Sequence, residues 1–301
     1  FGPFWARWAL GRGLLDGSYA LRDVPDARAA FAVSRPSVPH FVRAIAPVAP
    51  DPSATVSVIL PTIERYSYLR TLLSQLVAQT HPVHEILIVD QTPRGSRERD
   101  LATEFPQLPI RVIEQDVAGQ CTARNAALDV ATGDFALFID DDDEVEPDLV
   151  ARHLTTLATY GVDVSSGVAN EVGAGPVPES HSFLRFSDVF PTNNTMIRRS
   201  VLATSGMFDL AYDLKMVEDG DLGTRLYLAG VKMVLDPSIV VLHHHAPRGG
   251  LRAHGARAVT YASSRNRITH RNLPHVAEVY YGLRYYSPSQ VDEMLAQRAW
   301  G

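Results

Sequence analysis

Four consecutive aspartates, at positions 140–143, follow an apolar run at 135–139 and constrain the fold more than any other feature of the sequence. The run is short and rich in Phe and Ile, which predicts a buried strand. Four carboxylates cannot stay unpaired inside a core, because like charges repel and each ion has lost its hydration. We therefore expect the cluster at the carboxyl end of a strand, where open α/β sheets bind ligands, with a divalent cation as its partner. A solvated acidic loop is the alternative.

The sequence predicts that strands and helices alternate along most of the chain. Short apolar runs predict strands at 56–60, 85–90, 110–113, 135–139, 162–168, 193–198 and 239–242. Apolar residues at helical spacing predict helices at 69–77, 101–105, 122–131, 149–160 and 222–229. This alternation implies βαβ units with right-handed crossovers. The predicted fold class is therefore α/β, Rossmann-like, with a mostly parallel central sheet and helices on both faces.

The regular pattern covers residues 55–246, and the two ends of the chain differ from it. Residues 1–54 are predicted to form an N-terminal arm rich in Trp and Phe, and residues 247–301 a basic and aromatic C-terminal extension. Exposed aromatic side chains beside arginine suit a membrane surface or a partner. Packing of the arm on the main domain is the favoured alternative.

Composition and charge exclude several classes of protein. The net charge of −6 shows no basic surplus, so we expect no nucleic-acid partner. The single cysteine, Cys121, excludes an internal disulfide framework and fits a reducing compartment. No apolar run approaches the roughly 18 to 20 residues that span a bilayer, and no secretory signal pattern is present. We expect a cytoplasmic protein, with peripheral contact at the inner face of the membrane left open.

Six short motifs, in order, resemble those of family 2 glycosyltransferases with the GT-A fold. They are Pro61-Thr62-Ile63-Glu64-Arg65 after the first strand, Asp90 at the end of the second, Ala123-Arg124-Asn125, Phe138-Ile139-Asp140-Asp141-Asp142, Glu218-Asp219 and His243-His244-His245. The resemblance covers roughly residues 55–245. It divides the main domain into a nucleotide-binding half at about 55–145 and an acceptor-side half at about 146–246.

The resemblance implies a hexosyltransferase-like enzyme that moves a sugar from a nucleoside-diphosphate sugar to a hydroxyl group, with inversion. UDP, dTDP and GDP donors all remain open. The acceptor is expected to be a glycan or glycolipid of the cell envelope, with lipid-linked and small-molecule acceptors both open, and polysaccharide biosynthesis as the process. Mn²⁺ or Mg²⁺ is the implied cofactor, since a cation that bridges the phosphates stabilises the charge developing on the leaving group. The oligomeric state stays open.

The resemblance also assigns residues to the nucleotide-sugar pocket. They are Pro61, Thr62, Glu64, Asp90, Arg124, Asp140 and Asp141. For Arg124, a role as a surface arginine of a helix is an equal alternative. The fourth aspartate, Asp143, leaves the register of the acidic motif open by one residue.

The metal and the general base are assigned in the same way. Asp142 is the implied metal ligand, together with either His243 or His245, which are expected on one face of a strand because side chains alternate. Asp219 is the implied general base, which removes the proton of the acceptor hydroxyl, and Glu218 is the less favoured substitute.

The acidic motif has two alternative interpretations besides a transferase. In a haloacid-dehalogenase-like phosphatase, Asp141 would be the nucleophile and Asp143 the acid/base. That family places its motif after the first strand, whereas at least three predicted strands precede it here. The second alternative is a catalytically silent relative that only binds sugar nucleotides, which would not need Asp219. A calcium-binding EF-hand loop is excluded, since Val145 occupies the position that requires glycine.

Overall fold

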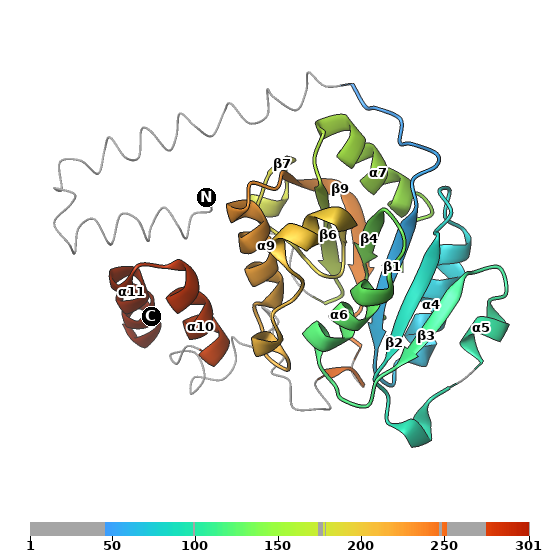
Figure 1. Cartoon of the computed structure of the whole chain (residues 1–301), viewed down its shortest axis with the longest axis horizontal. Helices are drawn as coiled ribbons and strands as arrows, with labels where there is room; N and C mark the ends of the chain where they lie inside the picture. The colour runs from blue at the N-terminus through green and yellow to red at the C-terminus, as the bar shows by residue number, and fades with distance from the viewer. Residues whose placement is uncertain are drawn as a thin grey trace. The chain divides into compact units, whose positions relative to one another are not determined.

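The computed structural model describes residues 46–98, 100–173, 177, 179–246, 249–251 and 275–300 (Figure 1). The described residues from 46 to 251 belong to one compact unit, and the helices α10 (Val276–Tyr285) and α11 (Pro288–Trp300) belong to another. Most of the predicted arm (1–54) and about half of the predicted extension (247–301) lie outside the described residues, so the proposed boundaries stay predictions. No helix among the described segments is long and apolar enough to cross a bilayer.

The first unit alternates strands with helices, as the sequence predicts. Its strands are β1 (Val56–Thr62), β2 (Glu85–Asp90), β3 (Ile110–Glu114), β4 (Phe135–Phe138), β5 (Asp143–Val145), β6 (Val164–Glu171), β7 (Arg185–Phe186), β8 (Thr195–Arg198) and β9 (Met233–His243). Its α-helices are α4 (Tyr66–Val77), α5 (Leu101–Glu104), α6 (Gln120–Val130), α7 (Leu149–Tyr160), α8 (Leu202–Ser205) and α9 (Glu218–Leu228). Short 3₁₀ turns occupy Arg94–Ser96, Glu179–His181, Arg199–Val201 and Leu210–Tyr212.

The strands form one sheet in the order β3-β2-β1-β4-β8-β6-β9-β5, and β7 also pairs with β9. Strands β1 to β4 are parallel to one another, as are β6 and β9, whereas β5, β7 and β8 are antiparallel to their neighbours. The prediction of a mostly parallel sheet is therefore confirmed. The order reverses at β1, because β2 and β3 extend the sheet on one side and β4 on the other. The carboxyl ends of β1 and β4 thus flank a topological switch point, where open α/β sheets bind ligands.

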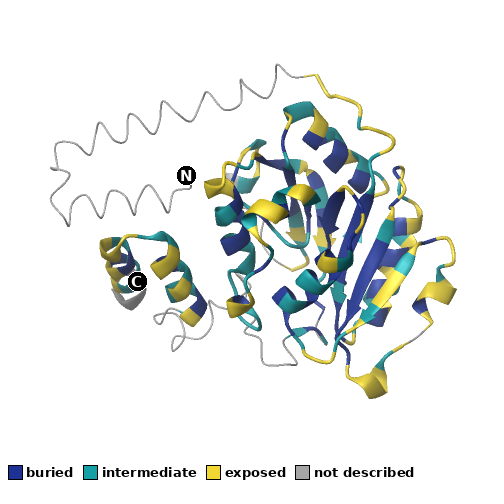
Figure 2. Ribbon diagram, in the orientation of Figure 1, coloured by how far each residue is buried: buried dark blue, intermediate teal, exposed yellow. Residues whose placement is uncertain are grey.

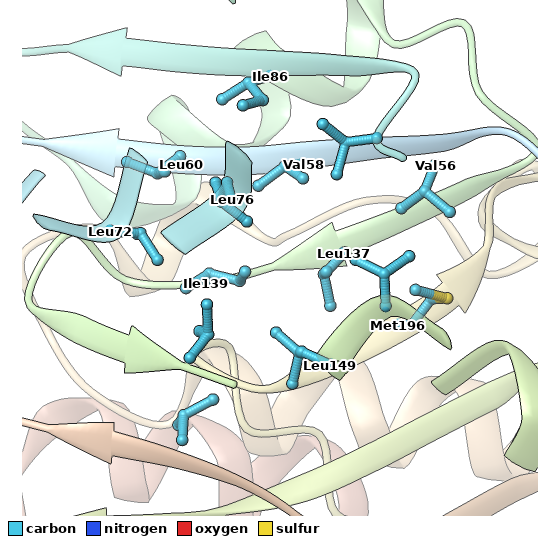
Figure 3. Close-up of a cluster of buried hydrophobic side chains, with 14 of the residues drawn as sticks. Val56, Val58, Leu60, Leu72, Leu76, Ile86, Leu137, Ile139, Leu149 and Met196 are labelled. Atoms are coloured by element: carbon cyan, nitrogen blue, oxygen red, sulfur yellow. The ribbon is translucent and has the colours of Figure 1, made fainter. Parts of the chain in front are cut away.

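Strand β1 runs through the centre of the hydrophobic core. Val58 and Leu60 pack in one cluster with Leu72 and Leu76 of α4 and with Leu149 of α7 (Figure 3). Burial of one such leucine contributes about 1.5–3 kcal/mol. The buried residues of α6 lie outside this cluster although α6 also packs on β1 and β2, so helices cover both faces of the sheet. The central strands are the most buried part of the unit and the outer faces of the helices are exposed (Figure 2).

Several strands extend beyond their predicted bounds, and β1 and β9 do so through a proline. Strand β1 passes through Pro61, where the prediction ended it, and Pro61 pairs in register with Val89. Strand β9 was predicted only at 239–242 but begins at Met233, because Pro237 falls where the pairing with β6 shifts register, opposite Gly167. A bulge of this kind accommodates proline within a strand, since no ladder hydrogen bond is required of it there.

Helix α6 begins at Gln120, two residues before the predicted start, because a distant side chain caps it. Asp213, which precedes α9 in sequence, accepts hydrogen bonds from the backbone N–H groups of Cys121 (2.7 Å) and Thr122 (3.1 Å). Such caps satisfy N–H groups that have no partner within the helix. A Cβ at Gly119 would lie 2.7 Å from the Asp213 carboxyl carbon, so a side chain at position 119 would displace the cap. The cap joins the two halves of the domain.

His153 of α7 is expected to make the stability of the fold depend on pH. Its ring is fully buried, with Nδ1 2.9 Å from Ser165 Oγ and Nε2 2.9 Å from Asn194 Oδ1. Burial lowers the pKa of His153 to about 4, against the opposing effect of the hydrogen bond that its ring makes to Asn194 Oδ1, while the unfolded chain keeps a value of about 6.5. The stability that neutral His153 contributes is therefore complete above about pH 6.5 and is lost as the pH falls towards about 4, by about 3 kcal/mol in total.

Urea unfolding of the wild type and of His153→Gln, from about pH 7 to about pH 4, measures this contribution. The difference in unfolding free energy between the two proteins is expected to narrow by about 3 kcal/mol over that range. A difference that does not change with pH would contradict the assignment.

Candidate functional site

A cavity of about 250 Å³ opens at the carboxyl ends of β1 and β4, at the switch point of the sheet. The sequence-predicted site residues that line it are Pro61, Thr62, Arg124, Asp140, Asp141, Asp142, Glu218 and His243. They come from five places: the end of β1, the loop after β4, helix α6, the start of α9 and the end of β9. The fold therefore gathers most of the predicted site around one space.

The two central aspartates are held by groups from β1, from the turn before α4 and from the segment after β9. Thr62 donates its hydroxyl hydrogen bond to Asp141 Oδ2 (2.7 Å). Arg65 donates through Nη1 to Asp141 Oδ1 (3.0 Å) and lies 3.1 Å from Asp142 Oδ1. The Ala246 N–H donates to Asp142 Oδ2 (2.7 Å). Both carboxylates are almost fully buried, and one arginine of this chain lies close to both.

Asp143 is paired with a histidine across two antiparallel strands. It begins β5 opposite His243 of β9, and its Oδ1 lies 2.7 Å from His243 Nδ1. Burial raises the pKa of Asp143 to about 7. Burial opposes protonation of His243, but the hydrogen bond to Asp143 and the neighbouring carboxylates prevail and raise its pKa to about 9. The hydrogen bond therefore favours the ionised carboxylate of Asp143 and the protonated ring of His243.

Arg124 of α6 links the acidic motif to the first turn of α9. Its Nη2 donates to Asp140 Oδ1 (3.0 Å), and its Nη1 lies 3.6 Å from Glu218 Oε1. Burial raises the pKa of Glu218 to about 7, with a further contribution from Asp219 and opposition from Arg124. Asp219 does not line the cavity; its Oδ1 accepts the Gly220 N–H (2.7 Å), and burial raises its pKa.

Two residues assigned to the nucleotide pocket do not line this cavity. Asp90 ends β2, but its carboxylate accepts hydrogen bonds from the Tyr66 hydroxyl (2.6 Å) and the Thr92 N–H (2.9 Å). Glu64 is exposed in the left-handed region, with φ of 56°, and its N–H donates to Thr92 Oγ1 (2.9 Å). Hydrogen bonds within the loop therefore turn both residues away from the space that their neighbours enclose.

The expectation that His243 and His245 share one face of a strand is wrong in its reasoning. Strand β9 ends at His243, and His245 lies beyond it in the left-handed region with φ of 51°, so strand alternation does not apply. The two rings still meet edge to face, with centroids 4.3 Å apart. His243 lines the cavity, whereas Nε2 of His245 lies 3.2 Å from Glu171 Oε2.

The cavity also has walls that the sequence analysis did not assign. They include Arg65, Gln91, Gln120, Thr192 and Lys215. Gln91 exchanges two hydrogen bonds with the backbone of Gly119, and Gln120 bonds the backbone of Tyr212, Leu214 and Lys215. Arg65 lies in the motif after the first strand, and Gln91 directly follows the end of β2. Their positions in the sequence were the only signals that could have identified them as site residues.

The residues around Asp142 fit a divalent cation. Burial opposes ionisation of Asp142, but the charges of His243 and Arg65 outweigh it and lower the pKa of the carboxyl. Its Oδ1 is buried and accepts no hydrogen bond, and it lies 3.8 Å from His243 Nδ1. Among the described residues no three acidic, histidine or cysteine side chains converge as a ready cage. Ions such as Mg²⁺ need only one or two carboxylates when substrate phosphates supply other ligands.

Comparison with known proteins agrees with this geometry. The family model described as "Glycosyl transferase family 2" matches residues 57–220. Glycosyltransferase GlyA of Streptococcus pneumoniae serotype 4 is 32% identical over 116 residues, which are 37% of this chain and 16% of that protein. The chain therefore spans only a small part of that curated relative.

Two solved structures share the fold at low sequence identity. Residues 1–349 of S. aureus TarS in complex with UDP-GlcNAc superpose with a TM-score of 0.58 and 18% identity, over 81% of this chain and 71% of that one. The mannosyltransferase PcManGT of Pyrobaculum calidifontis, in complex with GDP-Man and Mn²⁺, gives a TM-score of 0.56 and 20% identity, over 84% and 72%. The predicted GT-A fold is thereby confirmed.

Proposed function

Because the chain belongs to glycosyl transferase family 2, we propose that it moves a sugar from a nucleoside-diphosphate sugar to a hydroxyl group of an acceptor, by single displacement with inversion. One observation carries the proposal: a buried carboxylate oxygen of Asp142 that accepts no hydrogen bond faces a cavity at the switch point of the sheet. Relatives of the same fold have been solved with UDP-GlcNAc and with GDP-Man and Mn²⁺. UDP, dTDP and GDP sugars are all candidate donors.

We assign the donor and the cation to the acidic side of the cavity. Asp142 and His243 would hold Mn²⁺ or Mg²⁺, which supplies Lewis-acid stabilisation of the charge on the leaving diphosphate. His243 is preferred to His245 because it lines the cavity close to Asp142. Thr62 and Asp141, at the ends of β1 and β4, would orient the nucleoside, and Arg124 would keep the Asp140 carboxylate in place.

The general base is proposed to be Asp219. Inversion requires a carboxylate across the sugar from the leaving diphosphate, and therefore away from the residues that hold the cation. Glu218 lines the cavity, where its Oε1 lies 3.6 Å from Arg124 Nη1, so an ion pair already engages its carboxylate. Asp219 forms no such ion pair with the described residues, and burial raises its pKa, which suits a carboxylate that accepts a proton.

The acceptor is proposed to be a hydroxyl group of a glycan or glycolipid of the cell envelope. TarS is named as a poly(ribitol-phosphate) β-N-acetylglucosaminyltransferase, so the name of one relative gives a polymer as its acceptor. The acceptor side of the cavity would then be formed by residues of the half from 146 to 246. Peripheral contact with a membrane stays a prediction of the sequence.

The phosphatase alternative does not fit the positions of its two essential carboxylates. Asp141 lines the main cavity, whereas Asp143 lies in β5, hydrogen-bonded to His243, and lines a different, smaller cavity. A nucleophile and its acid/base must reach the same reacting atom. The family to which the chain belongs is also one of transferases.

Calorimetry with a panel of nucleoside diphosphates and nucleotide sugars, with and without Mn²⁺, tests the proposal. Wild-type protein is expected to bind one nucleoside diphosphate in a metal-dependent way, and Asp142→Ala is expected to lose that dependence because the ion loses its carboxylate ligand. Arg94→Met, an exposed change at the Asp116 ion pair, is the matched control. Phosphatase turnover without nucleotide binding would overturn the proposal, and binding without transfer to any acceptor would favour the silent relative.

A further inference from the structure

Arg65 is the cation that the fold itself supplies to the two central aspartates. Its Nη1 lies 3.0 Å from Asp141 Oδ1 and 3.1 Å from Asp142 Oδ1, and its side chain is 12% exposed. Neighbouring buried carboxylates repel each other unless a positive charge lies close to both. Arg65 therefore supplies part of the positive charge that the sequence alone assigns to a divalent cation.

Backbone groups from the segment after β9 enclose the Arg65 guanidinium. The Gly250 N–H donates to Ile63 O (2.8 Å), and the Ala246 carbonyl accepts from Arg65 Nη2 (3.4 Å). Gly249 and Gly250 both have positive φ, 71° and 67°. A Cβ at Gly250 would lie 2.6 Å from Arg65 Nη2. The guanidinium thus occupies space that a side chain at position 250 would fill.

We propose that Arg65 is a built-in counter-ion that leaves Asp142 when a divalent cation binds, and that it then pairs with the diphosphate of the donor. The proposal rests on the metal site proposed above at Asp142. Asp142 Oδ1 is close to Arg65 Nη1 already, and two cations cannot both occupy the same side of one buried oxygen. Arg65 lines the same cavity, where a diphosphate would offer it a fork of oxygens in place of the carboxylate.

This exchange makes the cation and the nucleotide bind cooperatively. A cation that arrives alone has to break the Arg65–Asp142 pair and leaves a guanidinium with one partner fewer. A diphosphate that arrives with it supplies the replacement partner, so each ligand raises the affinity for the other. Removing the guanidinium should therefore strengthen binding of the cation alone and reduce its coupling to the nucleotide.

The test is Mn²⁺ binding, followed by electron paramagnetic resonance, with and without UDP or GDP. Arg65→Met is expected to bind Mn²⁺ alone about tenfold more tightly than the wild type, because the ion pair with Asp142 no longer has to be broken. The enhancement of Mn²⁺ affinity by the nucleotide is expected to shrink in the same variant. A purely structural arginine would instead weaken both kinds of binding when removed.

Three further variants separate the possible outcomes. Gly250→Ala keeps the charge but pushes the guanidinium aside, so it should also tighten binding of Mn²⁺ alone, and it carries the test if Arg65→Met does not fold. Arg70→Met, at a half-exposed ion pair with Glu104, should change nothing. Equal or weaker Mn²⁺ affinity in both Arg65→Met and Gly250→Ala, with binding lost in Asp142→Asn, overturns the exchange but keeps the metal site. Absence of Mn²⁺ binding in every protein overturns both.

Discussion

Asp219→Asn is expected to lower kcat by about 10²- to 10⁴-fold while leaving the affinity for the donor nearly unchanged. The amide cannot remove a proton from the acceptor hydroxyl. Its side-chain oxygen can still accept the Gly220 N–H, which Asp219 Oδ1 accepts at 2.7 Å, so the first turn of α9 should remain intact. Turnover and donor affinity, measured separately, distinguish loss of a base from loss of a binding site.

Glu218→Gln is the matched comparison for this variant, because the two carboxylates are adjacent at the start of α9. Its effect on kcat is expected to be much smaller than that of Asp219→Asn. Burial raises the pKa of Asp219, so the acid limb of the pH–rate profile should lie above the ordinary aspartate value of about 3.9 and should vanish in the Asn variant. A larger loss of kcat in Glu218→Gln than in Asp219→Asn would make Glu218 the general base instead of Asp219.

Arg124→Met is expected to destabilise the fold by about 1–3 kcal/mol, because it leaves two partly buried carboxylates without their cation. The Arg124 side chain is 5% exposed and lies 3.0 Å from Asp140 and 3.6 Å from Glu218. Urea unfolding measures the loss. Burial already raises the pKa of Glu218 to about 7. Protonation of Glu218 in the variant should relieve the repulsion between neighbouring carboxylates, so the loss of stability should be smaller at about pH 6 than at about pH 8.

The double variant Arg124→Met with Glu218→Gln is expected to recover part of this stability, since the neutral amide no longer needs a cation. Arg94→Met is the control, because Arg94 forms its ion pair with Asp116 at 79% side-chain exposure and should contribute far less. Equal losses in Arg124→Met and Arg94→Met would contradict the buried role of Arg124.

The site was predictable where a residue type sits at the end of a buried strand. The aspartates after β4 and Thr62 after β1 could be assigned because the ends of parallel strands meet at one edge of the sheet. Asp90 obeys the same rule, yet its carboxylate binds Tyr66 and Thr92. Side-chain direction in a loop depends on such local hydrogen bonds, which sequence position does not reveal. For the same reason, the sequence did not reveal the contacts of Arg65 and Gln120.

The fold was predictable where apolar periodicity alone sets an element. Helix α7 and strand β2 have their predicted bounds, because each presents an uninterrupted apolar pattern. Helix α6 begins early only because Asp213 caps it from far along the chain. Strand β9 passes through Pro237 only because β6 shifts register opposite it. Both departures arise from tertiary contacts between segments that are distant in sequence.

The late position of β9 has a consequence for how the nascent chain assembles. Among the described strands, β5 and β7 pair with β9, and β6 pairs with it along most of its length. Synthesis delivers the N-terminal residues first, so these strands have open edges until residues 233–243 have left the ribosome. His243, the last residue of β9, then brings Asp143 its partner. A ribosome stalled before that point would hold a chain with unpaired strand edges and an incomplete acidic site, a form that invites aggregation.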